Sequence, residues 1–195
     1  GILSIAPYYN KPTQEGLYQH YKTIAQSVEI PFMLYNVPGR TGVDLLPETA
    51  IRLFDDVKNI YGIKEATGSL ERATAIISQR ENFFVFSGDD SVDFAMLASG
   101  AKGIISVTSN LVPNLKSKLV SSVMSGDFQT ALKIHNDLFE LNKVLFCEST
   151  PIPIKAAMYL SGLLDSLEFR LPLTKPSNET LEKLEKILKK YEVVK

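Results

Sequence analysis

Hydrophobic and polar residues divide most of this chain into two kinds of segment. Five short, almost uniformly apolar segments predict β-strands: Ile2–Ala6, Pro31–Val37, Asn59–Glu65, Phe83–Ser87 and Gly103–Val107. Between them lie segments with a helical hydrophobic period: Glu15–Val28, Pro47–Phe54, Glu71–Arg80, Ser91–Ser99 and Pro113–Ser125. Strands that alternate with helices through short links indicate parallel strands joined by crossover helices. Because the strands are apolar almost throughout, we expect both faces of the sheet to be buried.

The strand pattern stops after Gly126. Three amphipathic helices are predicted beyond it, with residues 169–176 as a linker before the last: Asp127–Leu145, Pro151–Leu160 and Asn178–Tyr191. We therefore divide the chain into an α/β part, residues 1–126, and a C-terminal helical subdomain, residues 127–195. We expect this subdomain to cover the wall of the α/β part or to join subunits.

Polar residues gather where each predicted strand ends. These strand exits are residues 7–10, 35–42, 64–68, 87–90 and 106–110, whereas the returns from helix to strand carry no such clusters. A (β/α)₈ barrel and an open doubly wound sheet both place their chemistry at this end of the strands. No G-x-G-x-x-G follows a strand, which argues against a dinucleotide site.

Lys64 is the residue of greatest chemical interest, because it ends an apolar run. Burying an ammonium group costs free energy unless the group is paired or neutral. A desolvated lysine has a lowered pKa, and its free amine can attack a carbonyl to form a Schiff base. A lysine at a strand end can instead extend its ammonium group to water. The pattern around Lys64 leaves both interpretations open.

Composition narrows the classes of partner and compartment. The net charge is −1, which gives no electrostatic reason for binding nucleic acid or an anionic membrane. Cys147 is the only cysteine, which excludes an internal disulfide and fits a reducing compartment, so we expect a cytoplasmic protein. His20 and His135 have no second metal ligand at a recognisable spacing. We expect no signal peptide, and no apolar run approaches the ~20 residues that span a membrane.

Five motifs agree in order and spacing with one known family. They are Pro-Tyr-Tyr-Asn-Lys-Pro at 7–12, Tyr-Asn-Val-Pro-Gly-Arg-Thr-Gly at 35–42, Gly-Ile-Lys-Glu-Ala-Thr at 62–67, Ser-Gly-Asp-Asp at 87–90 and Gly-Ile-Ile-Ser-Val-Thr-Ser-Asn at 103–110. Together they resemble the dihydrodipicolinate synthase family over essentially the whole chain. The resemblance implies a TIM barrel with extra C-terminal helices, and a homo-oligomer that is a dimer or a dimer of dimers, usually a tetramer. It implies condensation of pyruvate with aspartate semialdehyde through a Schiff base, on the route to diaminopimelate and lysine.

The resemblance also assigns roles to individual residues. Lys64 is the lysine that forms the imine with pyruvate, so no separate cofactor and no metal are needed. Tyr35 resembles the proton-relay tyrosine. Tyr9 resembles the tyrosine that reaches from one subunit into its neighbour's site. Tyr8 resembles the tyrosine that stacks at the dimer interface, near the place where some members bind lysine as a feedback inhibitor. Without the resemblance, these tyrosines would be core or half-buried surface aromatics.

Arg40 is the residue that best distinguishes the acceptor substrate. A planar guanidinium suits bidentate capture of a carboxylate, and the matching family arginine binds the carboxylate of the semialdehyde. Gly88 and Ile105 match positions that line the pyruvate pocket. The acidic residues nearby, Glu65, Asp89 and Asp90, are expected to support the site or to be solvated rather than to act in catalysis.

The sequence departs from the family in one large respect. We count five βα units where a barrel needs eight, and the family's first strands, with a Gly-Thr-Thr-Gly-Glu loop, are absent. The predicted fold is therefore a partial (β/α)₈ barrel followed by helices, and we expect this chain alone to be inactive. Two alternatives remain: a related pyruvate-dependent aldolase of the N-acetylneuraminate lyase superfamily, against which Arg40 argues, and a non-catalytic fragment or assembly module of the same fold.

Overall fold

The computed structural model describes residues 1–191, which form two compact units, residues 1–105 and residues from 106 onward. Each unit is described by itself. Compactness places helix α6 (Pro113–Met124) with the second unit, because α6 packs against the helix that follows it. The boundary predicted from the alternation of strands and helices instead lies after α6, at residue 126. That functional division of the chain stays a prediction.

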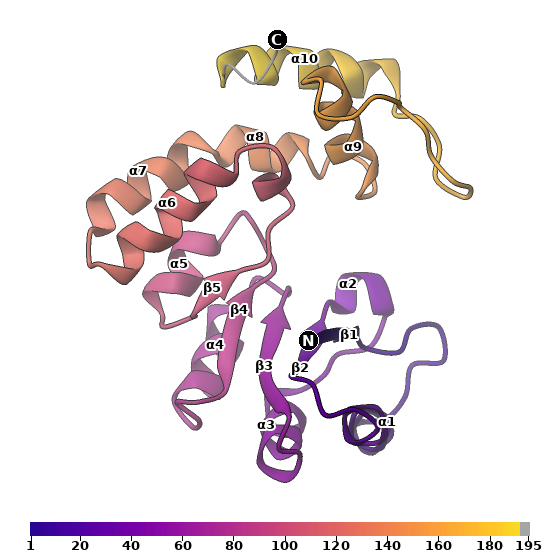
Figure 1. Cartoon of the computed structure of the whole chain (residues 1–195), viewed down its shortest axis with the longest axis vertical. Coiled ribbons are helices and arrows are strands. Elements are labelled where there is room, and N and C mark those ends of the chain that lie inside the picture. The colour runs from indigo at the N-terminus through magenta and orange to yellow at the C-terminus, as the bar shows by residue number, and fades with distance from the viewer. Residues whose placement is uncertain (192–195) are drawn as a thin grey trace. The chain divides into compact units, whose positions relative to one another are not determined.

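The first unit contains a five-stranded parallel sheet with the strands in sequence order (Figure 1). The strands are β1 (Ile2–Ile5), β2 (Phe32–Asn36), β3 (Ile60–Glu65), β4 (Phe84–Ser87) and β5 (Gly103–Ile104). All five coincide with predicted strands, and the parallel pairing confirms the crossover connections. Strand β5 is shorter than predicted, because Val107 already has helical dihedral angles and leads into the short 3₁₀ helix η1 (Thr108–Asn110).

Helices of the first unit connect these strands. They are α1 (Gln14–Gln26), α2 (Pro38–Thr41), α3 (Pro47–Asp56), α4 (Leu70–Ile77) and α5 (Asp93–Ala98). Side-chain oxygens of Thr13 and Ser69 cap the amino ends of α1 and α4, as hydroxyl residues commonly do. Helix α2 was not predicted, since it is a single turn inside the β2 exit. It ends at Gly42, whose φ of 69° is left-handed and favours glycine.

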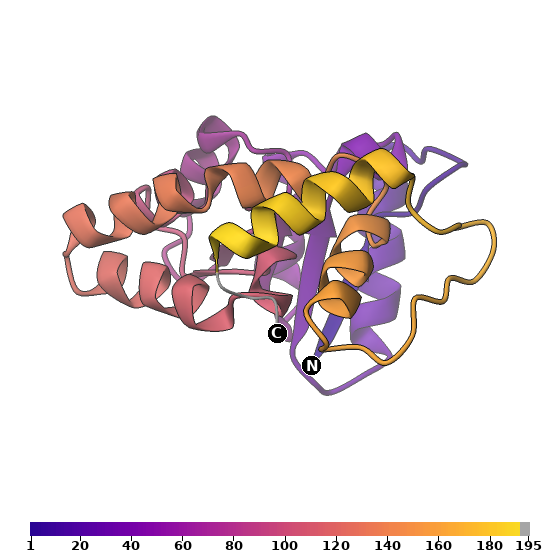
Figure 2. The same ribbon diagram turned by 90° about the horizontal axis from the view of Figure 1, so that it is seen from above.

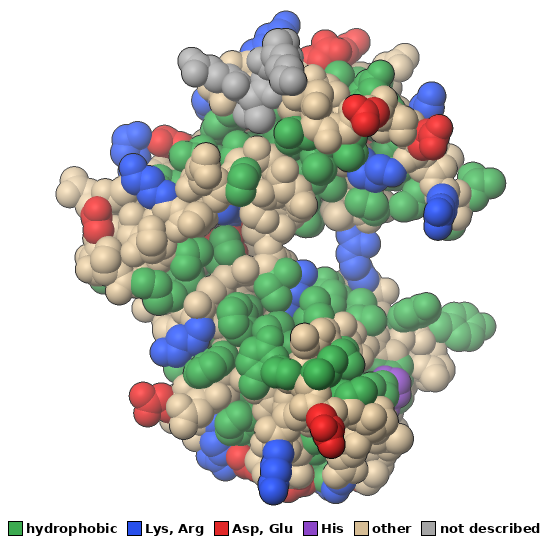
Figure 3. All heavy atoms as spheres, viewed as in Figure 1, with side chains coloured by type: hydrophobic (Ala, Val, Ile, Leu, Met, Phe, Trp, Pro, Cys, Tyr) green, Lys and Arg blue, Asp and Glu red, His purple; other side chains and the backbone are tan. Residues whose placement is uncertain are grey.

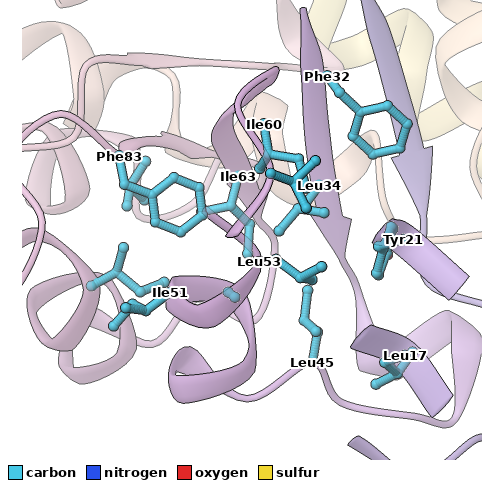
Figure 4. Close-up of a cluster of buried hydrophobic side chains, with 14 of the residues drawn as sticks. Leu17, Tyr21, Phe32, Leu34, Leu45, Ile51, Leu53, Ile60, Ile63 and Phe83 are labelled. Atoms are coloured by element: carbon cyan, nitrogen blue, oxygen red, sulfur yellow. The ribbon is translucent and has the colours of Figure 1, made fainter. Parts of the chain in front are cut away.

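One face of the sheet is covered by a hydrophobic core. Figure 4 shows Leu34 and Ile63 of the sheet facing Leu17, Tyr21 and Leu53 of the helices, all of them buried. The rings of Phe54 and Phe83 stack with their centroids 4.7 Å apart, an arrangement that adds to the free energy of burial. This layer fixes the direction of each strand and therefore the position of each strand exit.

The opposite face is not fully buried, contrary to the prediction for all five strands. In β1 the side chains of Leu3 and Ile5 are 46% and 37% exposed. Figure 3 shows hydrophobic side chains at the surface over the strands of this unit. An alternating β1 with one covered face is what a sheet with helices on only one side produces.

The second unit is helical beyond η1. Its helices after α6 are α7 (Phe128–Asp137), α8 (Phe139–Val144), α9 (Ile152–Leu160) and α10 (Asn178–Lys190). The single helix predicted over residues 127–145 is two helices that meet at Leu138. Helices α6 and α7 lie side by side, and α10 packs on α8 and α9 (Figures 1 and 2). None of the helices within residues 1–191 is long and apolar enough to cross a membrane.

Candidate active site

Lys64 and Tyr35 lie next to each other at the carboxyl ends of two neighbouring strands. They are register partners in the β2–β3 pair, and such partners project to the same face of a parallel sheet. The Lys64 Nζ atom is 4.3 Å from the centroid of the Tyr35 ring. Both side chains are half-buried. A phenol and an amine are thus held together at the end of the sheet where the sequence predicts the site.

The surroundings favour the neutral forms of both groups. Removal from water is the largest cause that lowers the pKa of Lys64, and the positive charge of Arg40 lowers it further, while Asp90 acts in the opposite direction. Removal from water raises the pKa of Tyr35, and Arg40 partly offsets that rise. The lysine therefore has a larger fraction of nucleophilic free amine near neutral pH than an exposed lysine has, and the phenol keeps its proton.

Gly88 leaves the space that the Lys64 side chain occupies. A Cβ atom at Gly88 would lie 2.7 Å from Lys64 Cε and 2.8 Å from Ala66 Cβ, closer than van der Waals contact allows. The Gly88 backbone N–H donates a hydrogen bond of 2.9 Å to the Glu65 carbonyl, which holds the two strand exits together. Glycine at this position therefore lets β4 approach the lysine closely.

The remaining predicted pocket residues lie around this pair. Arg40 is in α2 and is exposed, and it is close enough to Lys64 and Tyr35 to affect both pKa values. Ile105 follows β5 and donates its N–H to the Ser87 carbonyl at 2.8 Å, next to Gly88. The structure thus brings Lys64, Tyr35 and Gly88 together, with Arg40 and Ile105 on adjoining strand exits.

Tyr8 and Tyr9 lie outside this cluster. They occupy the loop between β1 and α1, and their side chains are 67% and 93% exposed. Tyr9 has a φ of 64°, a left-handed conformation that is uncommon for a residue with a side chain. Such an exposed tyrosine is available to another chain, which is the role that the resemblance implies. That role stays a prediction.

A buried polar network behind the strand ends was not found from the sequence. It joins Asn36, Asp44, Glu65 and Arg72, from β2, the segment before α3, β3 and α4. Glu65 is fully buried, so it is not solvated and instead supports the site. The sequence positions of Asn36 and Glu65 could have indicated the network, because each directly follows a predicted site residue. Strand alternation turns such residues away from Lys64 and Tyr35, toward the helices.

The side chains that the structure describes give no support for a metal site. Within residues 1–191, no three or more His, Cys, Asp or Glu side chains are grouped to hold an ion. The expectation that the imine itself replaces a cofactor stays a prediction.

Comparison with known proteins agrees with these observations. The model of the dihydrodipicolinate synthetase family matches residues 1–191. A 4-hydroxy-tetrahydrodipicolinate synthase from Aliarcobacter butzleri is 85% identical over 195 residues, which are 100% of this chain and 66% of that protein. One from Sulfurovum is 63% identical over 193 residues, 99% of this chain and 65% of that protein. This chain therefore spans about two thirds of the length of these relatives.

Solved structures give the same result for the fold. The dihydrodipicolinate synthase from Aquifex aeolicus superposes with a TM-score of 0.96 at 46% identity, over 98% of this chain and 66% of that one. The enzyme from Thermotoga maritima gives a TM-score of 0.96 at 44% identity, over 100% of this chain and 67% of that one. These matches confirm the predicted partial (β/α) barrel followed by helices. The chain belongs to the dihydrodipicolinate synthetase family.

Proposed function

We propose that this chain supplies the imine-forming part of a 4-hydroxy-tetrahydrodipicolinate synthase, a lyase that condenses pyruvate with aspartate semialdehyde. The observation that carries the proposal is Lys64, with its lowered pKa, 4.3 Å from the Tyr35 ring at the carboxyl end of β3. Its environment is the one that an amine nucleophile needs. The two relatives described above are both named 4-hydroxy-tetrahydrodipicolinate synthase, which agrees with this assignment.

Each residue has a separate task in this reaction. The free amine of Lys64 attacks the keto carbon of pyruvate, and loss of water gives the imine. Loss of a methyl proton gives an enamine, whose carbon forms the new bond with the aldehyde carbon of the semialdehyde. The phenol of Tyr35, which lies beside Lys64, gives a proton to one intermediate and takes a proton back from another. Arg40 holds the carboxylate of the semialdehyde, and Gly88 and Ile105 line the pyruvate side of the pocket.

Trapping of the imine tests this proposal. The protein for the assay is the chain joined to the part of the Aliarcobacter butzleri relative that it does not match, here named the completed chain. Reduction with borohydride in the presence of pyruvate should add the mass of the reduced pyruvate group to the peptide that contains Lys64. Labelling of Lys58 or Lys102 instead would contradict the assignment, and Lys64→Ala should remove the label.

We also propose that the enzyme is a homo-oligomer in which Tyr9 acts in a neighbouring site and Tyr8 contributes to the interface. The support is the exposure of both tyrosines outside their own chain's cluster. Completed chains that carry Tyr9→Phe should be mixed with completed chains that carry Lys64→Ala. Mixed dimers then contain one site with both residues intact and should regain activity. Verified mixed dimers that stay inactive would place Tyr9 in its own subunit's site.

We further expect little turnover from the 195-residue chain by itself. Leu3 and Ile5 leave the β1 face of the sheet exposed, so the pocket around Lys64 is not closed to water on that side. A coupled synthase assay on chain of verified mass, compared with the completed chain, measures this difference. Equal turnover of the two proteins would refute the expectation.

A further inference from the structure

The segment that carries Arg40 leaves the sheet after Asn36 and reaches Leu45 just before α3. The fully buried Asn36 side chain closes it: its amide donates to Asp44 Oδ1 at 2.8 Å, and its carbonyl accepts from the Leu45 N–H at 3.0 Å. Within the segment, the Thr41 hydroxyl donates to the Val43 carbonyl at 2.8 Å. Arg40 lies in this segment, so a shift of its backbone moves the point from which the exposed Arg40 side chain extends.

Arg72 connects the closed segment to the lysine strand. From the first turn of α4, its guanidinium donates to Asp44 Oδ2 at 3.0 Å and to the Leu45 carbonyl at 2.6 Å. The same group donates to Glu65 Oε2 at 3.3 Å, and Glu65 directly follows Lys64. The planar guanidinium has donors in several directions, so one side chain can hold three acceptors. A lysine ammonium at this position could not reproduce this planar arrangement.

We infer that Asp44 and Arg72 form a positioning pair that sets the Arg40 segment relative to Lys64, and so sets the affinity for the acceptor substrate. The inference rests on the function proposed above. The pair itself touches neither substrate. It acts through Arg40, because a shift of this segment moves the carboxylate-binding guanidinium away from the imine on which the semialdehyde must react.

A second arginine–aspartate pair, which has no connection to the Arg40 segment, can serve as a control. Arg80, just after α4, donates to both carboxylate oxygens of Asp55 at 2.7 and 2.8 Å. The side chains of Asp44 and Asp55 are both 39% exposed. Asp55 lies in α3 near the opposite ends of the strands, and its pair links only α3 to the residues after α4. The two carboxylates are equally exposed, but Arg72 is 15% exposed and Arg80 is 41% exposed, so losing the Asp44 contact should cost more stability, and the two variants are compared in KM and labelling only where both are folded.

The test compares Asp44→Asn with Asp55→Asn in the completed chain. Asparagine keeps the shape of aspartate but can accept from only one of the two donors, Asn36 or Arg72, so the connection is weakened. Asp44→Asn should raise the KM for aspartate semialdehyde roughly tenfold, with labelling of Lys64 by pyruvate and borohydride retained. Asp55→Asn should leave both quantities unchanged. Thermal unfolding of both variants identifies a temperature at which each is folded.

A variant with both substitutions shows whether Asp44 and Arg72 act together or independently. Arg72→Lys should raise the same KM, and the effects of Asp44→Asn and Arg72→Lys should be less than additive in the double variant, because the two substitutions share the Asp44–Arg72 contact. An Asp44→Asn variant with the parent KM, or additive effects in the double variant, would overturn the inference. If the unsubstituted completed chain fails to label Lys64, the proposed function itself fails. If the unsubstituted completed chain labels Lys64 normally and Asp44→Asn has the parent KM, only the positioning pair is rejected.

Discussion

The two ends of the first unit use similar residues for different purposes. At the carboxyl ends of the strands, Arg72 is 15% exposed and reaches the fully buried Glu65. At the amino ends, Arg80 and Asp55 are 41% and 39% exposed and pair at the surface. The Asn59 side chain also lies at this second end, within 2.8 to 3.1 Å of the carbonyls of Ala25, Val28 and Ile30.

This difference separates the candidate site from the contacts that hold the fold together. Desolvated charge is costly, and it is found where the strand ends hold a lysine, a tyrosine and their supporting network. At the amino ends, the Arg80–Asp55 pair is solvated and the Asn59 side chain fastens backbone turns. Barrel folds in general place catalytic residues at the first end and stabilising ones at the second. Substitutions at the two ends should therefore affect different measurements.

Gly88→Ala should give the largest effect, and it should be on chemistry. The added Cβ lies 2.7 Å from Lys64 Cε, so the lysine must move, and Ala66 limits where it can go. We expect the rate of imine trapping by borohydride to fall about 100-fold in the completed chain. Gly39→Ala is the control for trapping, because a Cβ there meets nothing within 4 Å. An unchanged trapping rate in Gly88→Ala would show that the lysine position is not restricted by β4.

Arg40→Ala should affect the acceptor substrate next. Loss of a charge-assisted carboxylate contact costs about 2 kcal/mol, so the KM for aspartate semialdehyde should rise at least about tenfold. Because the Arg40 charge lowers the pKa of Lys64, its removal raises that pKa and shifts the pH profile of imine trapping to higher pH. Arg52→Ala, which removes an exposed arginine paired with Glu15, is the control. A KM equal to the parent's would reject the role of Arg40.

Asn59→Ala should weaken stability without changing the chemistry. It leaves three backbone carbonyls without their side-chain donor, and these partly exposed groups can turn to water. We expect the free energy of unfolding to fall by about 1–2 kcal/mol, measured by urea denaturation. Asn82→Ala, at an exposed asparagine before β4, should have little effect. A change in the semialdehyde KM in Asn59→Ala would contradict the separation of the two ends.

The sequence predicted the strands well because their signal is local. Ile60–Glu65, for example, is an apolar run with flanking turn residues, and it forms β3 as expected. The prediction of burial on both faces failed at Leu3 and Ile5, because hydrophobicity does not reveal whether a covering layer is present. The helix predicted over residues 127–145 divides at Leu138, where no glycine or proline marks the bend.

The sequence singled out only the first layer of the candidate site. Lys64 was identified by a polar residue in an apolar run, and the motif around Tyr35 added its neighbour. Arg72 could not be identified in this way, because an arginine in the first turn of an amphipathic helix resembles any solvated charge. Its role depends on contacts between residues 28 positions apart in the chain, which only the folded structure brings together.

Lys64→Met should give the smallest effect, a gain in stability at the chemical end of the sheet. Removal from water lowers the pKa of Lys64, so the charged lysine is less favourable in the folded chain than in the unfolded chain. This penalty is fully present below the folded pKa and disappears as the pH rises toward the pKa of a lysine in the unfolded chain, ~10.4. Methionine has a similar length and no charge, so its folded state avoids the penalty.

At neutral pH we expect Lys64→Met to raise the Tm by about 2 °C, and the gain should shrink as the pH approaches that of lysine deprotonation. The half-buried position of Lys64 keeps the effect small, since water still screens part of the charge. Lys102→Met, at an exposed lysine, is the matched control and should show no pH-dependent gain. If Lys64→Met instead lowered the Tm at neutral pH, the charged lysine would be stabilised where it lies. The lowered pKa that the proposed nucleophile needs would then have to arise only when substrate closes the site.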